Sequence, residues 1–216
     1  VVVLHAGSSD GSCSVLPGCA TRKYHSSRRD AFKPINQEPI AHVKIGPDGP
    51  SIEMGDAVGF DARPEAISPM MFDESTRIAQ FVADAHLHPD LVQAAIDADY
   101  DALLFHGTGL GHLPIADPQE DSPENTRLRI MLADHCAAGG VVVVVTQTIH
   151  GPVHMDVYDK GRDQQEMGII GHGSLCPPSS ALVKLHHLLS RDEGRDAVAE
   201  GWDSDLVGEN PPDALS

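Results

Sequence analysis

The sequence is poor in aromatic residues, which make up only 4% of its 216 positions. Hydrophobic residues still account for 41%, so we expect a real core packed mainly with Val, Ile, Leu and Ala. No run reaches the roughly 18 apolar residues that a membrane helix needs. These absences indicate a globular protein without contact to a membrane.

The four cysteines also lack the spacing of known cysteine frameworks. Cys13, Cys19, Cys136 and Cys176 form no C-x-x-C pair, so neither a zinc ribbon nor a disulfide framework is indicated. No signal peptide is recognisable at the start. We therefore expect a cytoplasmic location.

Positive charge is scarce. The chain has 15 Lys and Arg against 32 Asp and Glu, which gives a formal net charge of −17. Such a charge disfavours nonspecific nucleic-acid binding and keeps copies apart. Ten of the cations are Arg. This fits the cytoplasm of a halophilic archaeon, where molar salt screens repulsion within about 3 Å, although a merely acidic protein is the alternative.

Local patterns predict an α/β fold. Residues 1–5 are predicted as a buried strand and 6–21 as a long loop, and "PIAHVKIG" (39–46) indicates another strand. Further along, strands and helices alternate. The predicted strands are 77–84, 101–109 and 141–148, and the predicted helices are 88–100, 122–140 and 177–191. This order is typical of a small, doubly wound parallel sheet with helices on both faces.

Two loops leave the carboxyl ends of the predicted strands, where parallel sheets bind ligands. They are "HGTGLGH" (106–112) and "TQTIHGPVHMDVY" (146–158). The first lacks the third glycine and the following helix of a dinucleotide fingerprint. We interpret it as a turn whose glycines allow a close backbone approach.

Thirteen histidines raise the alternative of a metallohydrolase. The candidates near this sheet edge are His86, His88, His106, His112, His150 and His154. A zinc site needs three or four such ligands to converge. Surface and capping histidines explain the pattern more simply, so we expect no metal.

The segment "RKYHSSRRDAFK" (22–33) gathers five of the 15 cations. It fits three hypotheses: a solvated loop, a nucleic-acid patch working against the field of the whole chain, or a cation that takes part in chemistry. A Lys beside other positive charges releases its proton more readily and can serve proton transfer.

Several segments together resemble one family, in one order. They are "GCATRKYHSSRRDAFKPIN" (18–36), "LVQAAIDADYDALLFHGTGLGHLP" (91–114), "VVVVVTQT" (141–148), "VYDKGRD" (157–163) and "ALVKL" (181–185). The sequence resembles the L-asparaginase type I/II superfamily, specifically the D-subunit family of the archaeal glutamyl-tRNA(Gln) amidotransferases. The resemblance runs from Val1 to about Arg191.

This resemblance implies an amidohydrolase that releases ammonia from glutamine or asparagine. In the family, a Thr in a Thr-Gly-Gly-Thr-Ile-Ala motif is the nucleophile, and a Lys assists a second Thr in a His-Gly-Thr-Asp motif. The Lys falls on Lys23, the expected catalytic residue. The loop with Gly109 and His112 is expected to bind substrate, and "HMDVY" (154–158) is a weaker candidate.

The resemblance also implies a division into domains. Residues 1–50 would be the end of a larger parallel-sheet catalytic domain, 51–75 a connecting segment, 76–191 the smaller C-terminal α/β domain, and 192–216 an acidic tail. Neither Thr motif occurs in these residues. The chain begins with Val inside an apolar run, so we expect a fragment that is inactive alone.

Partners follow from the same resemblance. The amidotransferase E subunit would amidate Glu-tRNA(Gln) with the released ammonia and use the ATP, so no cofactor is expected here and tRNA is met only through the partner. A homodimer through the asparaginase-like domains is expected. The alternatives are a free-standing cytoplasmic L-asparaginase and a noncatalytic α/β binding or dimerisation module.

Overall fold

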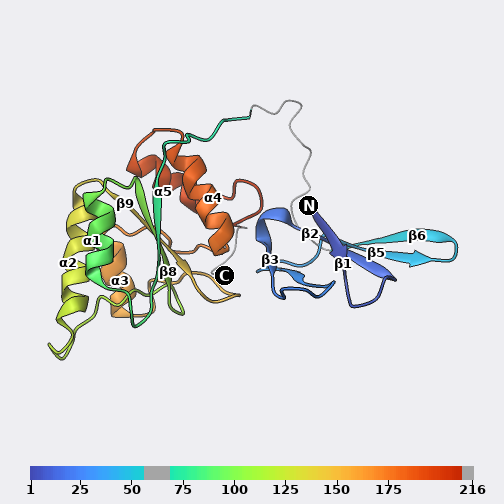
Figure 1. Cartoon of the computed structure of the whole chain (residues 1–216), viewed down its shortest axis with the longest axis horizontal. Helices are drawn as coiled ribbons and strands as arrows, with labels where there is room; N and C mark the ends of the chain where they lie inside the picture. Colours follow the sequence, from blue (N-terminus) through green and yellow to red (C-terminus); the bar gives the residue numbers. More distant parts are fainter. Residues whose placement is uncertain (56–68, 211–216) are drawn as a thin grey trace. The chain divides into compact units, whose positions relative to one another are not determined.

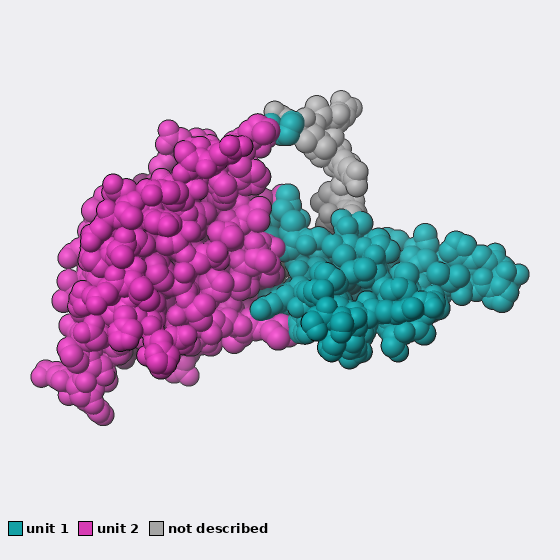
Figure 2. Space-filling model, viewed as in Figure 1, with its two compact units in different colours: residues 1–69, 207–209 teal, residues 70–206, 210–216 magenta. Residues whose placement is uncertain are grey.

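The structure, a computed structural model, describes residues 1–55 and 69–210. The chain divides into two compact units (Figures 1 and 2). The first comprises residues 1–69 with 207–209, and the second 70–206 with 210–216. In the described part of the chain, no helix is long and apolar enough to cross a membrane.

A parallel sheet of three strands lies at the centre of the second unit, in the order β7-β8-β9. Its strands are β7 (Ile78–Val82), β8 (Ala102–Gly107) and β9 (Val141–Thr146), and the helices between them are α1 (Pro89–Asp97) and α2 (Pro123–Ala137). The register places Phe81 beside Phe105 and Phe105 beside Val144. The predicted α/β class is confirmed.

Strands β8 and β9 are buried on both faces of this sheet, which explains the unbroken valine run of β9. Val142 and Val144 pack into one core with side chains of α1 and α2, whereas Val143 and Val145 pack into a second core with side chains of α4 and α5. Figure 1 shows these helix pairs on opposite sides of the sheet. The remaining helices are α3 (Asp159–Glu166), α4 (Pro178–Leu189) and α5 (Arg195–Asp203).

The first unit contains antiparallel strands. A four-stranded sheet has the order β1-β2-β5-β6, and β3 pairs with β4 in a separate hairpin. The strands are β1 (Val2–His5), β2 (Ser12–Leu16), β3 (Thr21–Lys23), β4 (Phe32–Pro34), β5 (Ala41–Gly46) and β6 (Gly49–Met54), and a 3-10 helix η1 spans Gly18–Ala20. Short connections join β1 to β2 and β5 to β6, and such connections suit antiparallel pairs, whereas η1, β3 and β4 lie in the chain between β2 and β5.

Three expectations for this region need correction. Strand β1 is not buried: it lies at the sheet edge, and Val1 and Val3 are 73% and 54% exposed. Strand β2 lies inside the predicted loop, and β6 extends into the predicted connecting segment. Both strands are short and rich in Ser, Gly or Pro, which are weak strand formers.

One face of the four-stranded sheet is apolar across all its strands. The register aligns Val3, Val15, Ala41 and Met54 in one row. Met54 is 67% exposed, and Ile52 on the same strand face is 68% exposed. The row is therefore exposed at its two ends, Val3 and Met54, and exposed apolar side chains of this kind are typical of a surface that receives another polypeptide.

Helix α5 lies within the segment 192–216, which the sequence suggests is an acidic tail. Val198 and Trp202, four residues apart on the helix, are buried in the core shared with α4. Lys184 of α4 is buried beside them and donates hydrogen bonds from Nζ to the carbonyl oxygens of Trp202 (2.8 Å) and Ser204. Its ammonium group thus caps the carboxyl end of α5, where cations are stabilising.

Replacing Lys184 by Met should lower the free energy of unfolding by about 2–3 kcal/mol, because two charge-assisted hydrogen bonds are lost and the carbonyl groups lose their donor. Urea unfolding followed by the fluorescence of Trp202, the single tryptophan, would measure this. Lys44→Met is the matched control, because Lys44 is exposed and pairs with Glu53, which is also exposed. Equal effects of the two substitutions would contradict the capping role.

Candidate functional site

The basic segment forms the β3-β4 hairpin and its connecting loop. The hairpin register pairs Lys23 with Phe32, and the Lys23 Nζ lies 5.7 Å from the centroid of the Phe32 ring. The Lys23 side chain is exposed, and within the described residues it makes no ion pair. Its ammonium group thus keeps its hydrogen-bonding capacity for another partner.

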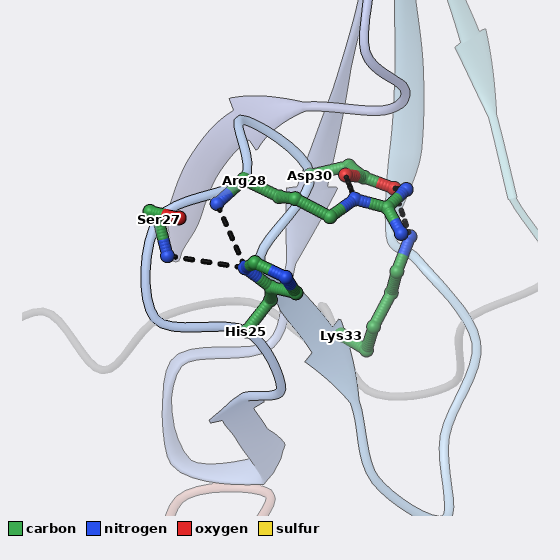
Figure 3. Close-up of polar contacts among 5 residues, drawn as sticks. All are labelled: His25, Ser27, Arg28, Asp30 and Lys33. Carbon is green, nitrogen blue, oxygen red and sulfur yellow. Dashed lines mark hydrogen bonds and ion pairs between the residues drawn. The ribbon is translucent and has the colours of Figure 1, made fainter.

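The loop between these strands is held by its own polar groups (Figure 3). His25 accepts hydrogen bonds at Nδ1 from the backbone N–H groups of Ser27 and Arg28, each at 3.1 Å. Arg28 binds both carboxylate oxygens of Asp30, at 2.9 and 2.8 Å, and the Lys33 Nζ lies 3.5 Å from the same carboxylate. These contacts fix the conformation of the loop.

Asp30 is the buried anchor of this arrangement. Burial raises its pKa, but the hydrogen bond and charge of Arg28, with a contribution from Lys33, hold the pKa below its ordinary value. Arg29 pairs separately with Asp10. Three of the five cations are therefore neutralised by carboxylates, whereas Arg22 and Lys23 have no such partner within the described residues.

The turn after β8 depends on two glycines. A Cβ on Gly107 would lie 2.5 Å from the backbone of Gly111, and a Cβ on Gly111 would lie 2.7 Å from the Val153 side chain. Gly111 also has a φ of +94°, which side chains disfavour. Thr108 and His112 then exchange backbone hydrogen bonds of 2.9 Å. The glycines thus allow the expected close approach, and it is made within the protein, between Gly107 and Gly111 and between Gly111 and Val153.

Gly109 lies at the exposed tip of this turn. It has a φ of +51°, and a Cβ at this position would meet nothing within 4 Å. Its carbonyl oxygen accepts a hydrogen bond of 2.5 Å from the Thr146 hydroxyl, which ties the turn to the end of β9. Its predicted role in substrate binding stays a prediction.

His112 is only 8% exposed, and its Nε2 atom is buried without a hydrogen-bond partner among residues 1–55 and 69–210. The ring meets Tyr158 edge to face, with centroids 5.5 Å apart. Burial, and secondarily the positive charge of Lys160, lowers the pKa of His112 below its ordinary value. The imidazole is therefore neutral at pH 7 and still has a polar atom to offer.

A pocket of about 370 Å³ opens beside this residue. Its polar lining residues are Asp84, Thr108, His112, Asn125 and Lys160. Asp84 follows the end of β7, His112 follows β8, and Lys160 lies in α3. The carboxyl edge of the parallel sheet thus brings together side chains that are far apart in the sequence. Lys23 belongs to the first unit, whereas His112 and Gly109 belong to the second.

The histidines proposed for a metal site do not converge as a set. Over residues 1–55 and 69–210, the one group of His, Cys, Asp or Glu with suitable spacing is His154, Asp156 and His172. His172 accepts the Met155 N–H at Nδ1, at 3.1 Å, so the neutral ring has its hydrogen on Nε2, 3.4 Å from Asp156. A protonated nitrogen has no lone pair for a metal ion, and this geometry therefore argues against the metallohydrolase alternative.

Sequence reasoning missed Asp84 and Lys160. Lys160 lies within "VYDKGRD", which contributed to the family resemblance but offered no separate signal of binding. Asp84 lies at the carboxyl end of the predicted strand 77–84, and this position could have indicated a ligand-binding residue.

The titration of His112 offers a direct check of this site. Its folded pKa lies below the unfolded value of 6.5, so the unfolded chain binds the proton more strongly. The stability that neutral His112 contributes is present above pH 6.5 and is lost as the pH falls through the folded pKa. NMR titration of the ring should give a midpoint below 6.5, and Lys160→Gln should raise that midpoint by removing a repelling charge. An unchanged midpoint in the variant would contradict the proximity of the two groups.

The fold is that of the asparaginases. The thermostable L-asparaginase from Thermococcus kodakarensis superposes with a TM-score of 0.69 at 22% identity, covering 92% of this chain and 55% of that one. L-asparaginase I from Vibrio cholerae gives 0.69 at 23% identity, covering 94% and 56%.

Residues 77–200 match the Glutaminase/Asparaginase C-terminal domain, and the chain belongs to this family. The D subunit of the glutamyl-tRNA(Gln) amidotransferase of Methanosarcina mazei is 34% identical over 214 residues, and that of Methanococcus maripaludis strain C5 is 31% identical over 214 residues. These alignments cover 97% and 96% of this chain but 44% and 46% of the relatives. The resemblance to D subunits is confirmed, and the chain spans slightly less than half of their length.

Proposed function

We propose that this chain is part of an amidohydrolase subunit that releases ammonia from glutamine or asparagine for the tRNA-dependent amidation of Glu-tRNA(Gln). The similarity to amidotransferase D subunits over nearly the whole chain supports this function. One structural observation supports it most directly. Within the described residues, Lys23 makes no ion pair and is exposed, in a hairpin whose other cations are mostly neutralised by Asp10 and Asp30.

The reaction would proceed through an acyl-enzyme. A Thr hydroxyl attacks the amide carbon, the carbon–nitrogen bond breaks, the hydroxyl proton reaches the departing ammonia, and water then cleaves the ester. Lys23 would assist the proton transfer of the second Thr. Arg22, which is also unpaired in the described residues, would help to attract an anionic amino acid.

The Thr residues would come from polypeptide that these 216 residues do not contain. The exposed apolar side chains of Val3, Ile52 and Met54 on one face of the four-stranded sheet support this part of the proposal, because such side chains suit a further layer of protein. Residues 1–216 alone would then be inactive as an amidase.

The proposed partners are the amidotransferase E subunit, which would use the ATP and amidate Glu-tRNA(Gln), and a second copy of the amidohydrolase itself. The free-standing asparaginase differs in one measurable property: its ammonia release would not depend on the E subunit or on charged tRNA. A noncatalytic module would show no amide hydrolysis even when the polypeptide with the Thr motifs is supplied.

Lys23→Ala, in a protein that contains both the Thr motifs and these residues, should lower kcat for glutamine or asparagine hydrolysis by about 10²–10⁴-fold, because proton transfer loses its assistant. Ammonia release is measured, with circular dichroism to show that the fold is intact. Lys44→Ala is the control, since Lys44 is an exposed lysine of the same unit that pairs with Glu53. Near-normal turnover in Lys23→Ala would reject the assignment.

A further inference from the structure

We infer that the pocket at the carboxyl edge of β7 and β8 binds the carboxylate of a small amino acid, with Lys160 as the residue that recognises it. The inference rests on the proposed function in one respect, because His112 is the expected substrate-binding residue. The inference adds the ligand's carboxylate as the recognised group and Lys160 as a second binding residue. The lining side chains of the pocket all come from the second unit.

Lys160 is a lysine of the pocket lining. Lys33 and Lys44 pair with carboxylates, and Lys184 donates to backbone carbonyl groups. Lys160 makes no hydrogen bond or ion pair within the described residues, although it lines the pocket of an acidic protein with a net charge of −17. Its neighbour Asp159 is engaged by Arg162. An anionic ligand group would give Lys160 the partner that the protein does not provide.

His112 gives independent support. Its side chain is more than nine-tenths buried, lines the same pocket and leaves Nε2 without a partner. A buried polar atom without a hydrogen bond is rare and costly, which points to a ligand at this position. A neutral imidazole with its hydrogen on Nε2 can donate to a carboxylate oxygen. His112 and Lys160 therefore line the same cavity with a neutral and a charged side chain.

Asp84 narrows the class of ligand to amino acids. One of its carboxylate oxygens accepts the His86 N–H at 2.7 Å, and the other has no partner within the described residues. A cavity that offers both a cation and a carboxylate suits a zwitterion, with the ammonium group of the ligand toward Asp84. The volume of about 370 Å³ lies at the lower end of the roughly 300–1,000 Å³ common for ligand pockets.

The test follows the His112 ring by NMR while the full chain is titrated with L-glutamate. Saturable shifts are expected, and bound glutamate should raise the His112 pKa, because a nearby carboxylate favours the imidazolium. Lys160→Gln should weaken binding about tenfold, as expected for the loss of a charge-assisted hydrogen bond. Lys44→Gln, which removes the same charge from the β5-β6 hairpin, should bind as the unaltered protein does.

Glutarate, which lacks the ammonium group, should bind more weakly than glutamate, and Asp84→Asn should remove that difference. Absence of saturable shifts at about 10 mM glutamate, or equal affinity in the Lys160→Gln and unaltered proteins, would overturn the inference. The readout is binding and not turnover. Glutamate binding in a protein without amidase activity would reject the proposed function alone, whereas amidase activity without binding here would reject this inference alone.

Discussion

The double-sided burial of the parallel sheet is the constraint on which the second unit depends. Strands β8 and β9 have no exposed face, so their polar backbone groups must be paired along the whole length of each strand. The three strands therefore end at one edge, and the loops after them start from fixed positions. The turn with Gly107 and Gly111 can then bring backbone close to backbone, and it places His112 in the lining of the pocket.

Both units contain cations that are paired within the protein and one lysine that is not paired within the described residues. Most cations of this acidic protein have carboxylate or carbonyl partners, and these contacts hold loops and helix ends in place. Lys23 in the first unit and Lys160 in the second lack such partners within the described residues. An unpaired ammonium group in a strongly negative chain attracts small anions, which a fully neutralised lysine does not. The two lysines thus differ from the structural Lys184 by their surroundings and not by their type.

The sequence predicts the second unit well, because its signals are strong and local. Five consecutive valines at 141–145 can only belong to a strand covered on both faces, and Pro123 with Gly139 bracket α2. Strand β2 escapes prediction because its serines resemble a loop, and α5 escapes because only Val198 and Trp202 mark its buried face. Resemblance alone indicates Lys23. Lys160 could not be predicted, because whether a lysine is paired depends on side chains brought near by tertiary structure.

The two units also differ in how much of the apolar surface of their sheets is buried within the unit itself. In the second unit, helices pack on both faces of the sheet. The pocket is therefore built by a unit that buries its own sheet. In the first unit, the row from Val3 to Met54 is partly exposed, while the Asp30 network of the hairpin is already formed. The hairpin that holds Lys23 is thus held by its own backbone pairing and by the ion pairs of Asp30. Polypeptide docking on that face would add burial there without having to rebuild the position of the lysine.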